Sequence, residues 1–240
     1  MMNSPPPRLH GGPDALGVPR FDFSTNSNAC GPCPQAFAAL QQADATRYPD
    51  PRYTVVCAHL ADFHGVALGR ILVAESASAC IFRITAWVAR RGGTRVCVPP
   101  HACGDYAQAA RAWGLEVAVA AGHGVQDADL VWCCEPSSPL GGAYSPWPDA
   151  GLATVVLDCA YAPLRLSGVS SWSDAQRKRV WQLFSPNKAL GLTGVRGAYA
   201  IDPEAAQTDV QALDALAPSW VLGAHGVALL QSWVQPGVQA

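Results

Sequence analysis

Short apolar runs alternate with longer segments of helical periodicity along most of the chain. Apolar runs bounded by turn residues are typical of buried strands, whereas apolar positions that recur every three or four residues indicate helices. The expected strands are 71–74, 95–98, 115–119, 130–134, 154–157, 179–184 and 197–201. The expected helices are 34–43, 52–65, 76–91 and 106–113, and residues 204 to about 234 are helical with a break near Pro218.

Several of the strands are apolar throughout, which indicates that both of their faces are covered. Their alternation with helices predicts an α/β protein in which a mostly parallel sheet lies between two helical layers, a three-layer α/β/α sandwich. Residues 1–34 are rich in Pro, Gly, Asn and Ser, and we expect them to form an extended N-terminal arm.

The composition excludes several classes of protein. Half of the 240 residues are hydrophobic, so a substantial core can form. The formal net charge is −2, and no basic face argues for nucleic acid. The first ten residues are polar and proline-rich, unlike a signal peptide, and no apolar run approaches the roughly 20 residues of a membrane helix. Nine scattered cysteines, several within apolar runs, indicate buried thiols in the reducing cytoplasm.

Cys30-Gly-Pro-Cys33 matches the thioredoxin redox motif. A redox dithiol should follow an apolar strand and open a helix, where its thiol pKa is lowered. Here a polar stretch precedes the motif and Pro34 follows it directly. The sequence favours a turn that carries two cysteines, and a redox role stays open. Zinc binding is not expected, because no second Cys/His pair has the spacing of zinc ligands.

The chain has only two lysines. Lys178 lies in the run Gln-Arg-Lys-Arg, which indicates a solvated helix face. Lys188 lies in an apolar and glycine-rich stretch, with Ser185 three residues before it and Arg196 eight residues after it. A desolvated amine loses its proton, becomes nucleophilic and can form a Schiff base with an aldehyde. We therefore expect Lys188 to bind pyridoxal 5'-phosphate (PLP).

Other candidate residues follow strands of the predicted sheet, where ligands of such sheets bind. Asp158 ends one strand; it is either a helix cap or the anion that keeps a pyridine nitrogen protonated. Tyr161 follows it and has a hydroxyl suited to the ring oxygen of the cofactor. A guanidinium such as Arg196 fits a phosphate bidentately. The small residues around Ser76 and Ala77 leave N–H groups for phosphate at a helix N-terminus.

Five motifs carry a resemblance to a known family. They are Arg47-Tyr-Pro-Asp-Pro51, Glu135-Pro-Ser-Ser-Pro-Leu-Gly141, Asp158-Cys-Ala-Tyr161, Ser185-Pro-Asn-Lys188 and the following Ala-Leu-Gly-Leu-Thr-Gly-Val-Arg196. Together with His10-Gly-Gly12 and Pro218-Ser-Trp220, they resemble the fold-type I PLP enzymes of the class I/II aminotransferase superfamily. The similarity is to the histidinol-phosphate aminotransferase and threonine-phosphate decarboxylase (cobalamin-pathway) branch, and the motifs occur in family order.

The resemblance implies a role for each residue. Lys188 would hold PLP and act as the acid and base at the substrate's α-carbon. Asp158 would pair with the pyridine nitrogen, and Tyr161 would donate a hydrogen bond to the 3'-oxygen. The phosphate would be bound by Arg196, Ser185 and the amides of Ser76 and Ala77, and by Tyr48 of a second subunit in a homodimer with shared sites.

The sequence also departs from the family pattern. Ser138 stands where the family has an asparagine that contacts the 3'-oxygen, and Cys103 stands where an aromatic ring stacks on the pyridine. The resemblance divides the chain into an arm (1–34), a PLP-binding large domain (35–203) and the helical start of a truncated C-terminal domain (204–240). The arginine that binds the substrate carboxylate would lie in that domain, and no residue of this chain takes its place.

Three functions therefore stand after the sequence analysis. The leading one is an aminotransferase that acts on an amino acid or amino-phosphate. The second is a decarboxylase of threonine phosphate, which uses the same lysine but breaks a different bond of the α-carbon. The third is a PLP-binding protein with weak or lost turnover, which the departures favour and the intact Lys188 and Asp158 oppose.

Overall fold

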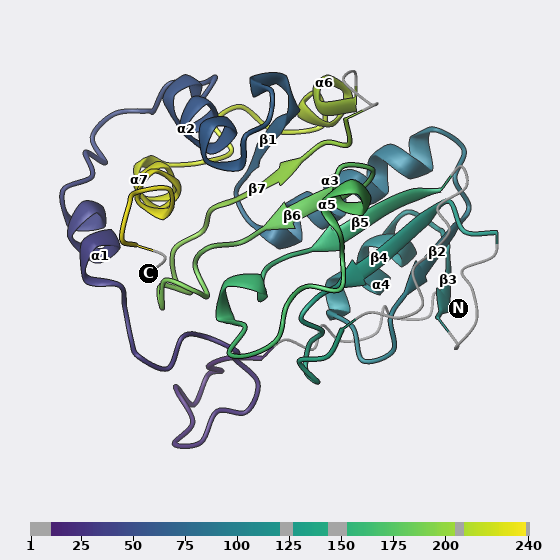
Figure 1. Ribbon diagram of the computed structural model, residues 1–240, viewed down its shortest axis with the longest axis horizontal. Helices are drawn as coiled ribbons and strands as arrows, with labels where there is room; N and C mark the ends of the chain where they lie inside the picture. Colours follow the sequence, from purple (N-terminus) through teal and green to yellow (C-terminus); the bar gives the residue numbers. More distant parts are fainter. Residues whose placement is uncertain (1–10, 121–126, 144–152, 205–208, 239–240) are drawn as a thin grey trace.

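The structure, a computed structural model, describes residues 11–120, 127–143, 153–204 and 209–238. One sheet of seven strands lies between two helical layers (Figure 1). The strands are β1 (Ile71–Ala74), β2 (Arg95–Val98), β3 (Glu116–Val119), β4 (Leu130–Cys134), β5 (Thr154–Asp158), β6 (Trp181–Phe184) and β7 (Ala198–Ile201). Residues 1–10 of the expected arm, with His10, and residues 205–208 and 239–240 of the C-terminal segment lie outside the described residues.

The strand order is β1-β7-β6-β5-β4-β2-β3. The pairs β2–β3, β2–β4, β4–β5 and β5–β6 are parallel, whereas β7 runs antiparallel to both of its neighbours, β1 and β6. Since β7 is antiparallel to both, β1 and β6 point the same way. The predicted α/β fold with a mostly parallel sheet is confirmed.

The helices begin and end close to the predicted positions. They are α1 (Pro34–Gln41), α2 (Thr54–His64), α3 (Ala77–Arg90), α4 (Gly104–Ala112), α5 (Asp174–Arg177), α6 (Asp209–Asp214) and α7 (Ala224–Trp233), with short 3-10 turns η1 (Leu68–Arg70) and η2 (Ala162–Leu164). Helix α3 begins where the Ser76 hydroxyl accepts a hydrogen bond from the N–H of Ala79 at 3.0 Å. Helix α2 ends at Gly65, whose positive φ of 61° suits glycine.

Alternate side chains of each strand enter opposite halves of the core. On β1, Leu72 and Ala74 pack with α3, α4 and α6, whereas Ile71 and Val73 pack with α1, α2 and α7. A third cluster continues the second face beneath β4 and β5 and includes Trp172. This arrangement explains why inner strands such as β4 are apolar throughout.

Two predicted segments differ in detail. The strand expected at 179–184 starts only at Trp181, because Ser173 and Gln176 form a capping box that turns the preceding residues into α5. The expected break near Pro218 is present, and it extends from the end of α6 at Asp214 to the start of α7 at Ala224. Both helices pack on the core of the sheet.

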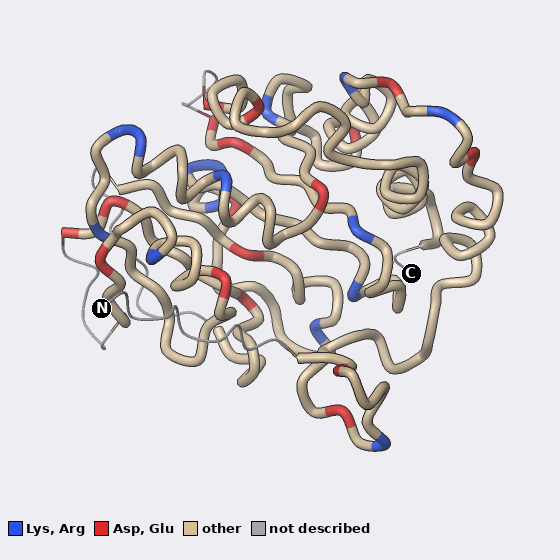
Figure 2. Tube along the Cα trace, turned by 180° about the vertical axis from the view of Figure 1, so that it is seen from behind, with Lys and Arg blue, Asp and Glu red and all other residues tan. Residues whose placement is uncertain are grey.

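Acidic and basic positions alternate over the described trace and do not gather on one side (Figure 2). No helix among the described residues is long and apolar enough to cross a membrane.

Asp202, which follows β7 directly, is a buried carboxylate without a hydrogen-bond partner among the described residues. The Arg70 guanidinium donates to the backbone oxygen of Asp202, at 2.7 Å, and not to its carboxylate. Burial, together with the negative charge of Asp209, raises the pKa of Asp202 to about 7. The folded state therefore holds a proton that the unfolded chain releases near pH 4.

We expect Asp202→Asn to stabilise the protein above pH 7. The raised pKa makes the free energy of unfolding of the natural chain fall as the pH rises from about 4 to about 7, and the amide removes this loss. Each unit of pKa difference corresponds to about 1.4 kcal/mol, so the gain at pH 8 should reach a few kcal/mol. Thermal unfolding of both proteins at pH 8 and at pH 4 measures the gain in stability, which should vanish near pH 4. An equal difference at both pH values would contradict the assignment.

Candidate active site

The candidate residues meet along one edge of the sheet. Because β1, β2, β4, β5 and β6 run in one direction and β7 in the other, the carboxyl ends of the five and the amino end of β7 share that edge. Every site residue predicted from the sequence, except Tyr48, belongs to a segment that leaves or enters a strand at this edge. These residues are Ser76 and Ala77 after β1, Cys103 after β2, Ser138 after β4, Asp158 and Tyr161 at the end of β5, Ser185 and Lys188 after β6, and Arg196 before β7.

Asp158 is the last residue of β5 and is buried. Its Oδ2 accepts a hydrogen bond from the hydroxyl of Tyr106 at 2.6 Å, and its Oδ1 accepts one from the N–H of Ala160 at 2.9 Å. Burial raises the pKa of Asp158, which these hydrogen bonds and the positive charge of Lys188 oppose. Such a carboxylate is suited to pairing with a buried cation.

Tyr106 is a site residue that the sequence did not single out. Its ring stacks on Trp132 of β4 with centroids 4.6 Å apart and an interplanar angle of 5°, and it is fully buried. The stack fixes the ring, and the hydroxyl then fixes the carboxylate of Asp158. In the sequence, Tyr106 occupies an apolar position of the predicted helix and looks like a core residue. No neighbouring residue in the sequence indicates its contact with Asp158.

Lys188 is half-buried in the loop between β6 and β7, and its Nζ lies 5.5 Å from the centre of the Tyr161 ring. The loop is held by the N–H of Leu192, which donates to the oxygen of Asn187 at 2.8 Å, and by the Ser185 hydroxyl, which donates to Asn187 Oδ1 at 2.7 Å. Lys178, by contrast, is exposed and forms an ion pair with Glu204 at 3.4 Å. Its predicted position on a solvated surface is confirmed.

Ser76 and Arg196 lie close to each other at the end of this edge formed by β1 and β7. The register of β1 against β7 pairs Ala74 with Ala198, so the residues just beyond that pair face each other. Both line one cavity of about 370 Å³ at the N-terminus of α3, whose wall does not include Lys188, Asp158 or Tyr161. A helix N-terminus next to a guanidinium favours an anion such as a phosphate.

Ser138 and Tyr161 form a polar cluster with a residue of the N-terminal arm. The amide Nδ2 of Asn26 donates to the Ser138 hydroxyl at 3.4 Å. Burial raises the pKa of Tyr161, and the neighbouring polar side chains of Ser138 and Asn26 oppose this rise. The sequence analysis missed Asn26, because its only signal was a polar stretch in a segment without regular structure.

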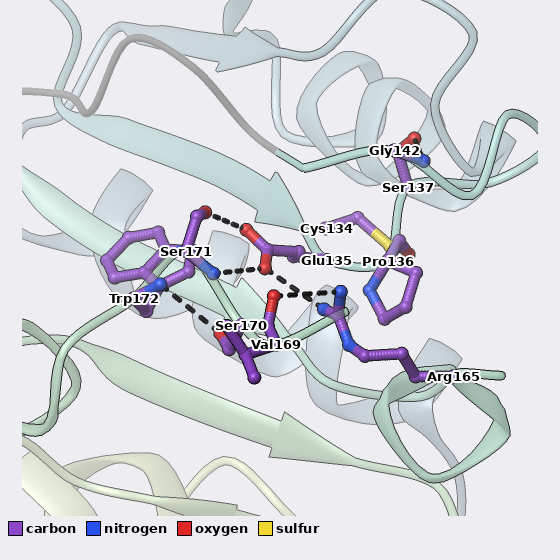
Figure 3. Close-up of polar contacts among 10 residues, drawn as sticks. All are labelled: Cys134, Glu135, Pro136, Ser137, Gly142, Arg165, Val169, Ser170, Ser171 and Trp172. Carbon is purple, nitrogen blue, oxygen red and sulfur yellow. Dashed lines mark hydrogen bonds and ion pairs between the residues drawn. The ribbon is translucent and has the colours of Figure 1, made fainter. Parts of the chain in front are cut away.

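Glu135, the first residue of the turn after β4, points toward Ser171 and Arg165 (Figure 3). Its buried carboxylate forms an ion pair with Arg165 at 3.0 Å. It also accepts hydrogen bonds from the N–H of Ser171, at 2.7 Å, and from the Ser171 hydroxyl. These contacts tie the turn that carries Ser138 to the segment that follows Tyr161, and they restrict both loops.

One expected residue, Tyr48, stands apart from this edge, whereas Cys103 lies at it, where the charges of Asp158 and Lys188 act on its thiol. Tyr48 is 78% exposed, stacks on Trp220 with centroids 4.5 Å apart and lines a separate surface cavity. Cys103 is exposed at the start of α4. In the motif Cys30-Gly-Pro-Cys33, both cysteines are free thiols in a turn before α1, and no strand precedes the motif among residues 11–29.

Comparisons with known proteins identify relatives of the chain. Histidinol-phosphate aminotransferase 1 of Thiobacillus denitrificans is 31% identical over 217 residues, which are 78% of this chain and 55% of that protein. No family model matches the chain. The chain spans between 55% and 59% of the length of the curated relatives it matches.

Two solved structures share the fold. The L-threonine-O-3-phosphate decarboxylase of Porphyromonas gingivalis aligns with a TM-score of 0.74 at 20% identity, over 90% of this chain and 70% of that one. The histidinol-phosphate aminotransferase of Sinorhizobium meliloti in complex with pyridoxal-5'-phosphate aligns with a TM-score of 0.66 at 21% identity, over 87% of this chain and 62% of that one. By sequence similarity and by fold, the chain is a relative of the histidinol-phosphate aminotransferases with the fold-type I architecture of the class I/II aminotransferase superfamily.

Proposed function

We propose that the chain is the PLP-binding part of an aminotransferase that acts on an amino acid or an amino-phosphate. The observation that carries the proposal is the position of a half-buried amine, Lys188, and a buried carboxylate, Asp158, at the same edge of the sheet. The sequence similarity to histidinol-phosphate aminotransferases and the fold shared with a PLP-containing relative support it.

The residues at this edge fit the cofactor. The buried carboxylate of Asp158, with a raised pKa, is suited to the cation of a protonated pyridine ring. Ser76, Ala77 and Arg196 surround a helix N-terminus that suits the phosphate, and Ser185 lies buried after β6. The hydroxyl of Tyr161, whose ring lies next to the amine of Lys188, offers a donor for the ring oxygen.

When bound, PLP withdraws electrons from the bond that breaks at the substrate's α-carbon. Asp158 would keep the ring nitrogen protonated, and Tyr106 would orient Asp158. Lys188 would hold the cofactor covalently and then move a proton to and from the α-carbon, since its half-buried Nζ lies at this edge of the sheet. Tyr161, whose ring lies beneath that amine, would donate to the ring oxygen.

Decarboxylation of threonine phosphate, a step of cobalamin biosynthesis, is the second candidate. The fold shared with the decarboxylase of Porphyromonas gingivalis supports it. The two reactions differ in which bond of the α-carbon lies perpendicular to the ring, which depends on how the substrate carboxylate is held. A PLP-binding role with weak turnover is the third, and the exposed Cys103 in place of a stacking ring supports it.

One titration tests the proposal. Adding PLP to the purified protein should produce the absorbance band of a lysine-bound cofactor. Histidinol phosphate should then convert that band to the pyridoxamine form, whereas threonine phosphate should release CO2 if the second candidate is correct. A stable band that no amino acid changes would support binding without turnover. The absence of any band would refute all three.

We also propose that the protein is a cytoplasmic homodimer in which Tyr48 completes the site of the partner subunit. The exposed stack of Tyr48 on Trp220 leaves an aromatic surface for a second copy, and all nine cysteines are free thiols. Residues 35–203 would form the large domain, and residues 204–240 would begin a further one.

A subunit-mixing experiment tests the shared site. Lys188→Ala and Tyr48→Ala proteins, each inactive or weakened alone, should regain turnover when mixed, because a hybrid dimer contains one site with both natural residues. Mixing Lys188→Ala with Asp158→Asn is the matched control and should restore nothing, since both residues would come from the same subunit. A monomer in sedimentation with PLP present would contradict the dimer.

A further inference from the structure

The N-terminal arm reaches the polar cluster formed by Ser138 and Tyr161. Asn26 Nδ2 lies 3.4 Å from Ser138 Oγ, and both side chains oppose the rise that burial causes in the pKa of the nearby Tyr161. Three polar groups from distant parts of the chain therefore converge beside the amine of Lys188, whose Nζ lies over the Tyr161 ring.

Neighbours of Asn26 hold the arm in this place. The N–H of Asn28 donates to the backbone oxygen of Lys188 at 3.0 Å, and its side-chain amide donates to the oxygen of Ala189 at 2.9 Å. Close to these contacts, the carbonyl of Gly31 occupies the space that a side chain at Gly191 would need. The arm is thus packed directly on the lysine loop, and Asn26 is presented to the site.

Serine and asparagine differ in what they can offer at such a point. The Ser138 hydroxyl is short and has one hydrogen, and its oxygen already accepts from Asn26. A carboxamide nitrogen carries two hydrogens, so Asn26 can donate to Ser138 and to a second acceptor at once. A phenolate oxygen is such an acceptor, and a hydrogen bond to a charged oxygen is stronger than a neutral one.

We propose that Asn26 is a cofactor-positioning residue, which donates from the arm the amide hydrogen bond to the ring oxygen of PLP that Ser138 is too short to supply. The inference rests on the proposed function, because it requires PLP between Lys188 and Asp158. If the inference is correct, the arm is part of the site. Asn26 then supplies the amide that an asparagine at position 138 would otherwise provide.

A double-mutant cycle tests the proposal. The proteins are the natural chain, Asn26→Ala, Ser138→Asn and the double variant, and PLP affinity is measured by absorbance titration. Asn26→Ala should weaken PLP binding by about tenfold in the natural background. It should weaken binding by less than about threefold in the Ser138→Asn background, because the asparagine at 138 then supplies the amide. The pH at which the bound cofactor changes its absorbance should shift in the same pattern.

Asn26→Asp serves as the matched control, since it keeps the size of the side chain and removes its donors; it should weaken PLP binding at least as much as alanine does. Thermal unfolding of the unloaded variants should be unchanged, because Asn26 is exposed. Equal losses in both backgrounds, or no loss with aspartate, would overturn the assignment of Asn26 while PLP binding itself stands. If the natural chain binds no PLP, the proposed function fails, and this inference fails with it.

Discussion

Replacing Lys188 with alanine is expected to abolish covalent attachment of PLP. With the natural chain, borohydride reduction in the presence of PLP should place the label on the peptide that contains Lys188. Without the amine no imine can form, so the variant should carry no label, and turnover should fall by more than about 10²-fold because the proton-transfer group is lost as well. Mass spectrometry of the reduced and digested protein measures the label.

Lys178→Ala is the matched control, because Lys178 is the other lysine and is exposed in an ion pair with Glu204. Its label and turnover should equal those of the natural chain. If the label persists in Lys188→Ala, or is lost in Lys178→Ala, the reactive amine is not Lys188.

Asp158→Asn should separate attachment of the cofactor from its use. An amide cannot keep the ring nitrogen protonated, so the ring withdraws fewer electrons from the bond that breaks at the α-carbon. We expect kcat to fall by about 10³-fold, equivalent to about 4 kcal/mol of activation free energy, whereas the borohydride label on Lys188 should persist. The measurements are single-turnover kinetics and the label yield.

Stability distinguishes this effect from damage to the fold. The amide oxygen can still accept from the N–H of Ala160, and the amide nitrogen can donate to the Tyr106 hydroxyl. The substitution also removes a buried carboxylate whose pKa is raised by burial. The unloaded variant should therefore unfold at the same temperature as the natural chain or higher. The exposed Asp62→Asn is the control for loss of a carboxylate in general. Full turnover in Asp158→Asn would refute the role of Asp158.

The inner strands were predictable because they are buried on both faces and therefore apolar throughout, as in Leu130–Cys134. Lys188 and Asp158 stood out because a lone amine and a carboxylate at strand ends are rare in apolar surroundings. The direction of β7 was not predictable, since hydrophobic periodicity carries no information about strand direction.

The missed site residues depend on contacts between distant segments. Tyr106 meets Asp158 across 52 positions of the chain, and Asn26 meets Ser138 across 112. Neither residue has a local sequence signal. An aromatic residue in a helix is typical of the hydrophobic core, and an asparagine in the arm is typical of a loop. Glu135 belonged to a turn motif by resemblance, yet its ion pair with Arg165 appears only in the folded chain.

The antiparallel course of β7 has a consequence for the order of assembly. The loop that connects β6 to β7 begins and ends at the same edge of the sheet. The backbone pair Phe184–Tyr199 joins the two ends of this loop. The amine of Lys188 and the guanidinium of Arg196 are thus held by contacts of short sequence separation, which form quickly because little loop entropy is lost. The groups proposed to hold the aldehyde carbon and the phosphate of the cofactor are therefore expected to be arranged early, before the distant arm and its Asn26 arrive.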